Sequence, residues 1–172
     1  MDPKIELPLE LELYNNEWPQ QFEKEKKKLN QLHPTYFTRI EHIGATSIPK
    51  SSAKPIIDIL AIIDGFDEID NIISILNEKK YVFSNKHRSG KYYYFIKHDN
   101  NNIFYSLTVM SSDNPKDINK LLSFKKFLME NPKAASKYQF LKSVLSIEYP
   151  DDQNKYANAK DEFVNDISKN FK

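Results

Sequence analysis

Before residue 110 the hydrophobic residues lie mainly in short apolar or alternating runs, and after it they recur at helical spacing. Short apolar or alternating runs bounded by polar residues are typical of β-strands. These runs predict strands at 36–43, 55–63, 81–85, 91–98 and 102–110. Two further segments carry apolar residues at helical spacing and predict helices, 17–32 and 67–80.

Three helices are expected in the last third of the chain. Each begins with a polar cap residue or a proline, at Asn114–Pro115, Asn131–Pro132 and Pro150–Asp151. They predict helices near 115–130, 132–147 and 151–170. The order of elements predicts the α+β class, with a mixed β-sheet, flanking helices and a helical C-terminal part. We expect a single domain over 1–172, with a sheet core at about 15–112 and the helical part at 113–170.

Local patterns add detail to this fold. Residues 1–14 alternate apolar and polar positions and predict an extended arm or an edge strand. Asn16 is expected to cap helix 17–32, whose run KEKKK at 24–28 predicts a solvated helix face. Strand 55–63 is apolar on both faces, which favours a central place in the sheet, and HDNNN after strand 91–98 predicts a hairpin turn.

Composition narrows the class of protein. The 172 residues are 40% hydrophobic and 28% charged, which is ordinary for a globular domain, and the formal net charge is +1. That charge does not indicate a nucleic-acid or membrane partner. The absence of cysteine excludes disulfides, thiolate catalysis and cysteine-ligated zinc. The acidic, proline-interrupted start resembles neither a signal nor a transit peptide, no apolar run is long enough to span a membrane, and we expect a cytoplasmic protein.

A glycine, a threonine and a serine follow the predicted strand 36–43. Gly44 permits a positive φ or a close backbone approach, and Thr46 and Ser47 can cap a short helix whose first turn contains Pro49. The same geometry binds phosphate, because exposed N–H groups and the helix dipole favour an anion, and Lys54 would add charge. In the alternative interpretation Ser47 only caps a helix and Gly44 only turns the chain.

Asp58 lies alone among apolar residues in strand 55–63. A carboxylate there is costly unless it is paired, hydrogen-bonded or bound to a metal ion. Asp58 and Leu60 point to the same face of the strand, and a two-metal site would need acids at both positions and a third on a neighbouring strand. The neighbouring strand 103–110 offers Ser106 and Thr108 instead. By sequence the metal cluster is therefore incomplete.

Three groups of residues carry a resemblance to a known family. They are Tyr14 with Trp18–Pro19 and Phe22, EHIGATSIP…AKPIIDI at 41–59, and FLMENPKAASKYQFLK…YPDDQNKYANAKDEFV at 127–164. Together they resemble the GrpB family, an uncharacterised branch of the nucleotidyltransferase (polymerase β-like) superfamily. A related domain is fused to some dephospho-CoA kinases. The resemblance extends over nearly the whole chain and is weaker over 64–110.

The resemblance implies a nucleotidyltransferase-like mixed sheet and a set of site residues. Gly44, Ala45, Thr46 and Ser47 fall on the motif that holds nucleotide phosphates in that superfamily, with Ala45 where the branch usually has serine. Asp58 falls on the first metal-binding acid and would be the catalytic and metal residue. Leu60 falls where the wider superfamily carries the second acid, and Ser106 or Thr108 stands where family members commonly carry histidine.

Other residues near these motifs are weaker candidates. His42 could orient a phosphate or act as a base, and a partly buried structural histidine explains it equally well. Arg88 could clamp a phosphate with two hydrogen bonds and Lys91 could balance charge, or both could be ordinary loop residues. One or two of the tyrosines at 92–94 could stack on a base, while strand alternation buries the rest.

Two functions follow from these observations. The first is Mg²⁺-dependent transfer of a nucleotidyl group from a nucleoside triphosphate to an unknown acceptor, with Asp58 on the metal. The alternative is a non-catalytic module that binds a nucleotide or a CoA-like phosphate through a degenerate metal site. A third option is a scaffold whose helical C-terminal part binds a protein. In the first two the ligand is a nucleoside triphosphate or another phosphorylated small molecule.

Overall fold

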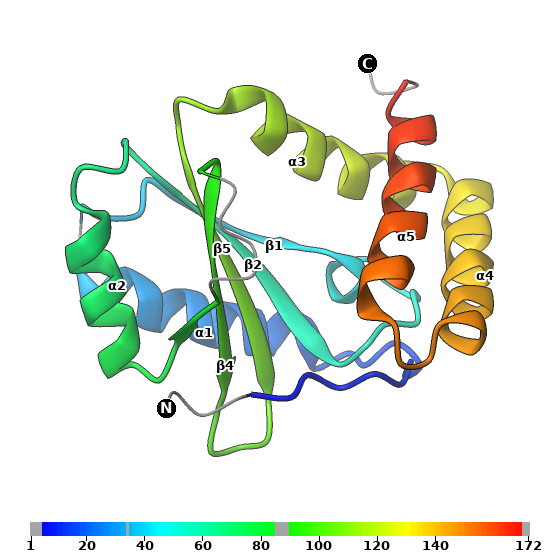
Figure 1. The fold of residues 1–172 in the computed structure, drawn as a ribbon, viewed down its shortest axis with the longest axis horizontal. Coiled ribbons are helices and arrows are strands. Elements are labelled where there is room, and N and C mark those ends of the chain that lie inside the picture. Colours follow the sequence, from blue (N-terminus) through cyan, green and yellow to red (C-terminus); the bar gives the residue numbers. More distant parts are fainter. Residues whose placement is uncertain (1–4, 34, 85–89, 170–172) are drawn as a thin grey trace.

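The structure is a computed structural model that describes residues 5–33, 35–84 and 90–169. Its elements are α1 (Trp18–Leu32), β1 (Arg39–Ile43), the 3₁₀ turn η1 (Ala45–Ser47), β2 (Ile56–Ile63), α2 (Ile69–Glu78), β3 (Val82–Phe83), β4 (Tyr92–His98), β5 (Phe104–Ser111), α3 (Pro115–Glu130), α4 (Pro132–Glu148) and α5 (Gln153–Ser168). Figure 1 shows α1 behind the strands and α3, α4 and α5 grouped above and to the right of them. No helix in the described part of the chain is long and apolar enough to cross a membrane.

The strands form a mixed sheet in the order β1-β2-β5-β4-β3. β2 runs parallel to β5, and β1 and β4 pair antiparallel with β2 and β5 respectively. The predicted α+β class and the central place of β2 are therefore confirmed. The strand that carries Ser106 and Thr108 is the neighbour of β2, as the sequence analysis expected, and the register sets Asp58 opposite Ser106 and Leu60 opposite Thr108.

Side chains that accept hydrogen bonds from the backbone help to set where α3 and α1 begin. The Asn114 side chain accepts from the backbone N–H of Asp117 at 3.5 Å, so the predicted start of α3 is confirmed. The prediction that Asn16 caps α1 is wrong: Asn15 Oδ1 accepts from Glu17 N–H at 2.8 Å and the helix begins at Trp18.

Of the two predictions for the N-terminal arm, the edge strand is wrong. Over residues 5–14 the structure has no strand and a single bridge, in which Glu12 pairs with Ala53, as an arm outside the sheet would have. The segment beside it, at 50–53, continues into β2 and is held by α4 rather than by the sheet. Strand 81–85 is likewise shorter than predicted, covering Val82–Phe83, and residue 85 lies outside the described part of the chain.

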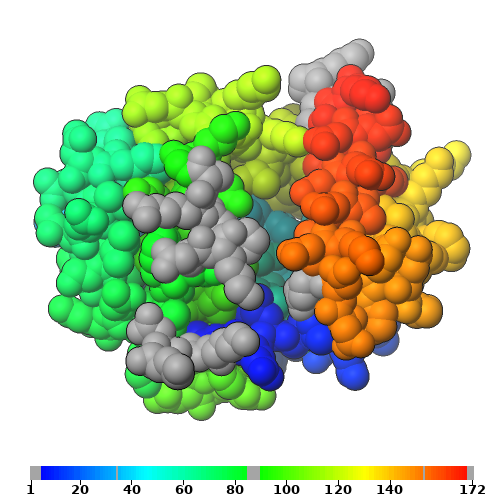
Figure 2. All heavy atoms as spheres, in the orientation of Figure 1, coloured from blue at the N-terminus to red at the C-terminus, as the bar shows by residue number. Residues whose placement is uncertain are grey.

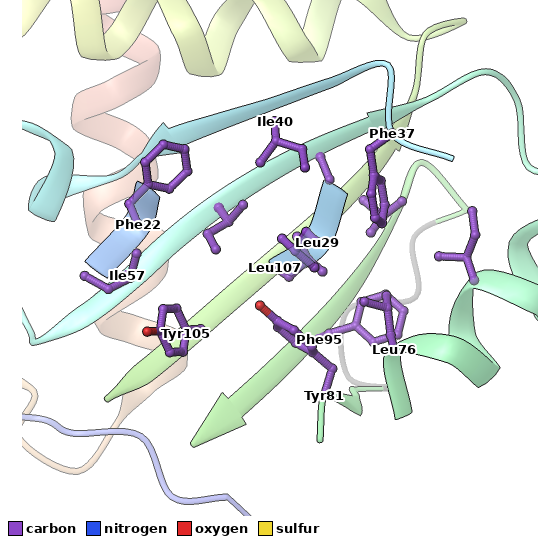
Figure 3. Packing of buried hydrophobic residues seen from close by; sticks show 14 of the residues in the cluster. Phe22, Leu29, Phe37, Ile40, Ile57, Leu76, Tyr81, Phe95, Tyr105 and Leu107 are labelled. Atoms are coloured by element: carbon purple, nitrogen blue, oxygen red, sulfur yellow. The ribbon is translucent and has the colours of Figure 1, made fainter. Parts of the chain in front are cut away.

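The two faces of the sheet are covered unequally. One face packs on α1 and α2 through a large apolar cluster that includes Phe22, Leu29, Leu76, Phe95 and Leu107 (Figure 3). The opposite face has a smaller cluster around Leu60, Met110 and Ile118, built with α3. A third cluster joins α3, α4 and α5 to one another around Leu128 and Tyr138. The second face is thus only partly covered, and it is the face to which Asp58 belongs.

Candidate functional site

A cavity of about 590 Å³ lies between the partly covered face of the sheet and the helices α3 and α5. Figure 2 shows a hollow between the strands and α5, with a small teal area from the β1–β2 part of the chain visible inside it. The strands contribute Asp58, Ser106 and Tyr94 to its lining, Gly44 lies directly after β1, and α5 contributes Asp161. Several residues that the sequence marked as candidates therefore share one cavity.

Asp58 is held at this cavity by a neighbouring strand. Ser106 Oγ donates a hydrogen bond to Asp58 Oδ1 at 2.5 Å, across the β2–β5 register. Burial raises the pKa of the Asp58 carboxyl, while the Ser106 hydrogen bond and the charge of Lys160 act in the opposite direction. Ser106 and Lys160 therefore offset part of the cost of burying the carboxylate, and the larger effect of burial still raises its pKa.

Position 44 requires glycine for two reasons, which are its backbone conformation and its closeness to Asp58. Its φ is 69° and its ψ −175°, a conformation that residues with a side chain rarely adopt. A Cβ at this position would overlap the Asp58 carboxylate and lie 2.9 Å from its Cγ. The close approach that the sequence predicted for Gly44 is thus an approach to the candidate metal-binding acid.

The other residues of the predicted phosphate turn bond within the protein. Thr46 Oγ1 donates to the Ile56 carbonyl at 3.1 Å, and Ser47 Oγ donates to the Gly44 carbonyl at 2.6 Å. Both side chains are buried, and Ala45 packs against the large core cluster. The prediction that Ser47 caps a helix containing Pro49 is wrong, because η1 ends at Ser47. Of this turn, only Gly44 lines the cavity.

His42 lies on the other face of the sheet. Its ring stacks on Phe22 with centroids 4.8 Å apart, and its Nε2 lies 3.0 Å from Thr46 Oγ1. Because that hydroxyl already donates to Ile56, Nε2 must be the donor. Burial, with a smaller effect of Lys125, lowers the pKa of His42 to about 4. His42 is therefore a neutral structural residue in this arrangement and does not reach the cavity.

The sequence predicted three basic residues at the phosphate site, and of the two that the structure describes only Lys91 lines the cavity. Lys91 Nζ lies 3.5 Å from Asp117 Oδ2, and both residues line the cavity. Lys54 Nζ lies 4.3 Å from the centroid of the Tyr156 ring, at the start of β2. Arg88 lies outside the described residues, so its predicted role is not examined by the structure.

Two lysines that the sequence did not mark lie close to Lys54. Lys160 Nζ is 4.8 Å from the centroid of the same Tyr156 ring. Lys142 is 3% exposed, and its ammonium donates to Ser51 Oγ at 3.3 Å and to the Ser52 carbonyl. Burial and the charge of Lys160 lower the pKa of Lys142 to about 8. Lys54, Lys142 and Lys160 are called the lysine cluster below.

The sequences of α4 and α5 contain a pattern that could have identified Lys142 and Lys160 as candidate site residues. Lys142 follows Tyr138 by four residues and precedes Leu145 by three, inside the apolar stripe of α4. Lys160 stands in the same relation to Tyr156 and Phe163 on α5. A lysine inside an apolar stripe is either buried or directed into a site, so it could have been marked as a candidate.

The tyrosines of β4 divide between the two faces as alternation predicted. Tyr92 and Tyr94 line the cavity, whereas Tyr93 packs on the core side with its ring 5.1 Å from that of Phe66. Burial and the nearby Asp58 carboxylate raise the pKa of Tyr94 to about 12, with Ser106 acting in the opposite direction. The cavity therefore has aromatic surface beside its carboxylate.

The residues at the cavity do not fit a cluster of magnesium ions. A two-metal site needs several carboxylate oxygens, yet Leu60, Ser106 and Thr108 occupy the strand positions nearest Asp58. Asp117 and Asp161 line the cavity at other points. Among the described residues, no three His, Cys, Asp or Glu side chains lie close enough together to hold a metal ion.

Comparison with known sequences identifies relatives over most of the chain. A family model described as GrpB protein matches residues 8–170. The UPF0157 protein YqkA of Bacillus subtilis is 30% identical over 164 residues, which cover 95% of this chain and 47% of that protein. The glutamate-rich protein GrpB of Alkalihalophilus pseudofirmus is 28% identical, with 90% of each protein covered. The chain thus spans about half the length of YqkA and most of the length of the second relative.

Comparison with solved structures supports the same fold. The conserved protein GrpB from Enterococcus faecalis superposes with a TM-score of 0.83 at 31% identity, over 94% of this chain and 96% of that one. The Cid1 poly(U) polymerase superposes with a TM-score of 0.59 at 10% identity, over 87% of this chain and 49% of that one. The nucleotidyltransferase-like fold that the resemblance implied is therefore confirmed. At 10% identity the second similarity concerns the fold alone.

Proposed function

The chain belongs to the GrpB family, and from this premise we propose that the cavity beside Asp58 binds a phosphorylated small molecule, with nucleotides as the first class to test. The observation that carries the proposal is the charge around Asp58. The buried Asp58 carboxylate lines the cavity and is influenced by the charge of Lys160, which shares the Tyr156 ring with Lys54, on a fold that other proteins use to bind nucleotides.

The lysine cluster has more positive charge than Asp58 can balance. Burial lowers the pKa of Lys54 and of Lys142, and the charge of Lys160 lowers both further, so Lys160 repels each of the other two ammonium groups. Clustered cations with little opposing charge raise the local concentration of anions. A phosphate group would supply the missing negative charge and accept charge-assisted hydrogen bonds from the lysines.

The cavity also suits the rest of a nucleotide. Its volume of about 590 Å³ lies in the usual range of small-molecule sites, roughly 300–1,000 Å³. Tyr92 and Tyr94 offer aromatic surface on which a base could stack. Gly44 lets the backbone approach Asp58 without a side chain between the two. These features favour a ligand with a phosphate end and a flat end.

Mg²⁺-dependent nucleotidyl transfer is a second candidate, favoured by the place of Asp58. The carboxylate lines the cavity on a central strand of a nucleotidyltransferase-like fold. Cid1 structures with that fold contain Mg 3′-dATP, MgGTP and MgATP. The residues near Asp58 do not supply the further acids that such chemistry needs, so binding is the function that the geometry supports best.

Thermal unfolding in the presence of nucleotides tests the proposal. Wild type is melted with ATP, GTP, CTP and UTP, each with Mg²⁺ and with EDTA. A ligand at about 100 times its dissociation constant adds roughly 2.7 kcal/mol to the free energy of unfolding, which gives a clear rise in melting temperature. Lys126→Met is the matched control, because Lys126 is 74% exposed and lies on the same helical part.

The outcomes separate the two candidates. A shift with at least one nucleotide, equal in Lys126→Met, supports a nucleotide site. A shift that requires Mg²⁺ and disappears in Asp58→Asn would favour nucleotidyl transfer over simple binding. If none of the four nucleotides raises the melting temperature under either condition, the proposal is wrong for nucleoside triphosphates, and both nucleotide binding and nucleotidyl transfer are excluded.

A further inference from the structure

The outer side of α4, at the right-hand edge of the molecule in Figure 1, carries large apolar residues that are exposed to solvent. Phe140, Val144 and Ile147 are 73%, 39% and 81% exposed, and they are three of the six exposed large hydrophobic residues in the described part of the chain. The inner side of the same helix is buried around Tyr138 and Leu145. Because α4 is apolar on both sides and packs on only one, its outer side is suited to a further partner.

The same outer side is basic at one end and acidic at the other. Lys133 and Lys137 precede the apolar residues, Glu148 follows them, and all three are exposed. At about 100° per residue, these three positions and the three apolar ones fall within about 100° of the helix circumference. The α4 face is therefore defined as Lys133, Lys137, Phe140, Val144, Ile147 and Glu148. From the start of the helix to its end it is basic, then apolar, then acidic.

The charges of the α4 face oppose the dipole of their own helix. Acids stabilise the first turn of a helix and bases the last, because N–H groups are exposed at the start and carbonyl groups at the end. α4 has no acid in its first turn and no base in its last turn; Lys133 is its second residue and Glu148 its last. The stability of α4 by itself therefore does not account for this order of charges.

We propose that the α4 face is the contact between two copies of this chain, with their α4 helices antiparallel about a two-fold axis. When the axis passes midway between Phe140 and Ile147, each Phe140 meets Ile147 of the other copy. At about 1.5 Å per residue, Lys137 then lies about 3 Å along the helix from Glu148 of the other copy. In a parallel pair, lysine would face lysine and glutamate would face glutamate. The antiparallel pair is thus the self-complementary one that a two-fold contact requires.

Sedimentation equilibrium of the full chain tests the contact. One helix face is a small interface, so we expect a weak dimer that forms as the concentration rises from about 10 μM to about 1 mM. Ile147→Ser removes an apolar side chain from the contact and should weaken dimerisation at least tenfold. Leu13→Ser is the matched control and should leave it unchanged, because Leu13 is 85% exposed and lies on the N-terminal arm.

Charge reversal tests the antiparallel arrangement. Lys137→Glu places an acid beside Glu148 of the other copy, and Glu148→Lys places a base beside Lys137, so each variant should dimerise at least tenfold more weakly than wild type. The double variant exchanges the two charges and should recover wild-type affinity. An equimolar mixture of the two single variants should form mixed dimers, because every acid of one then lies beside a base of the other.

Three results would overturn the proposal. A monomer at every concentration would mean that the α4 face binds a different partner. Dimers that persist in Ile147→Ser would form through another surface. Charge variants that all dimerise alike, or a double variant and a mixture that do not recover, would show that the helices are not antiparallel. If circular dichroism shows that Ile147→Ser is unfolded, Phe140→Ser replaces it. None of these results depends on nucleotides, so each leaves the proposed function in place.

Discussion

Two clusters of buried charge lie on opposite faces of one sheet, and they differ in balance. On the face covered by α1, Glu25 is 1% exposed, and its Oε1 accepts from Tyr81 Oη at 3.0 Å and from Lys97 Nζ at 2.6 Å. Its other oxygen accepts from Lys28 at 3.2 Å. On the face covered by α3 and α5, the charge of Lys160 acts on Asp58 and also on Lys54 and Lys142.

In the Glu25 cluster, which consists of Glu25, Lys28, Tyr81 and Lys97, the side chains hydrogen-bond to one another. It is called the closed cluster below. Lys97 lies over the rings of Tyr81 and Tyr105, at 4.9 and 5.5 Å from their centroids, and its ammonium is paired with Glu25. A cavity of about 440 Å³ lies beside this cluster, but the carboxylate there already accepts three hydrogen bonds. The lysine cluster instead has an excess of positive charge. Burial of charge is therefore common to both clusters, and the proposed ligand site is distinguished from the Glu25 cluster by the imbalance of its charge.

The largest expected effect comes from breaking the closed cluster. Glu25→Gln leaves the buried Lys97 without its counter-ion, and the loss of one partner of a buried pair costs about 3–5 kcal/mol. Urea unfolding should show this decrease in the free energy of unfolding. The double variant Glu25→Gln/Lys97→Met should recover part of it. A decrease below about 1 kcal/mol would mean that the pair is not buried as described.

Gly44→Ala should cause the next largest decrease in the free energy of unfolding. Gly44 lies beside Asp58, at the other cluster of the comparison. The backbone conformation alone costs about 1–3 kcal/mol for a residue with a side chain, and the new Cβ overlaps Asp58. The cost should therefore be smaller in an Asp58→Ala background, which removes the overlapping carboxylate but keeps the Cβ of residue 58, 3.0 Å away. Chemical denaturation of the four proteins of this cycle measures the coupling. Equal costs in both backgrounds would contradict the close approach of Gly44 to Asp58.

Lys142→Met should change how stability depends on alkaline pH. The pKa of Lys142 falls from 10.5 to about 8 on folding, so between these values the unfolded chain binds the extra proton. Wild type should therefore gain stability relative to Lys142→Met as the pH rises from 8 to 10.5, by at most about 1.4 kcal/mol per unit. Urea unfolding across this range measures the difference. A constant difference would show that Lys142 titrates normally.

Asp58→Asn should have the opposite pH trend in the acid range. Burial raises the pKa of Asp58 above its usual 3.8, so its contribution to stability is full below that value and is lost as the pH rises through the raised pKa. The variant cannot ionise. It should gain stability relative to wild type as the pH increases through this window. A variant that loses relative stability over the same range would show that the ionised carboxylate is the favoured form.

The smallest effect is expected for an exposed ion pair. Lys126 Nζ lies 3.9 Å from Glu130 Oε1, and both side chains are more than half exposed. Lys126→Met should change the free energy of unfolding by no more than about 0.5 kcal/mol. Guanidinium unfolding measures it. A larger change would weaken the use of this variant as the control for charge.

The positions of the strands were predictable because the physical signal is local, whereas their register comes from the structure. The apolar run at 55–63 with a single carboxylate fixes both the central strand and the face of Asp58, and Ser106 follows from pairing with the next apolar strand. Gly44 was recognisable because few residues adopt its backbone conformation. These predictions needed only spacing, alternation and side-chain chemistry.

The remaining features depend on tertiary packing. Glu25 lies in a lysine-rich run that predicted a solvated face, yet it is buried because Lys97 and Tyr81 reach it from the sheet. That prediction is wrong for this residue. The burial of His42 and the convergence of Lys54 with Lys160 depend on how α1 and α5 sit against the strands. The sequence pattern of a single element does not contain that information.

Equilibrium dialysis of ATP against two matched lysine variants tests the central claim most directly. Lys160→Met removes a cation from the unbalanced cluster, and Lys28→Met removes one from the closed cluster on the far face. Both variants lose the same net charge. The account predicts at least tenfold weaker ATP binding by Lys160→Met and wild-type binding by Lys28→Met. Equal affinities in the two variants would contradict the claim that unbalanced charge near Asp58 marks the ligand site.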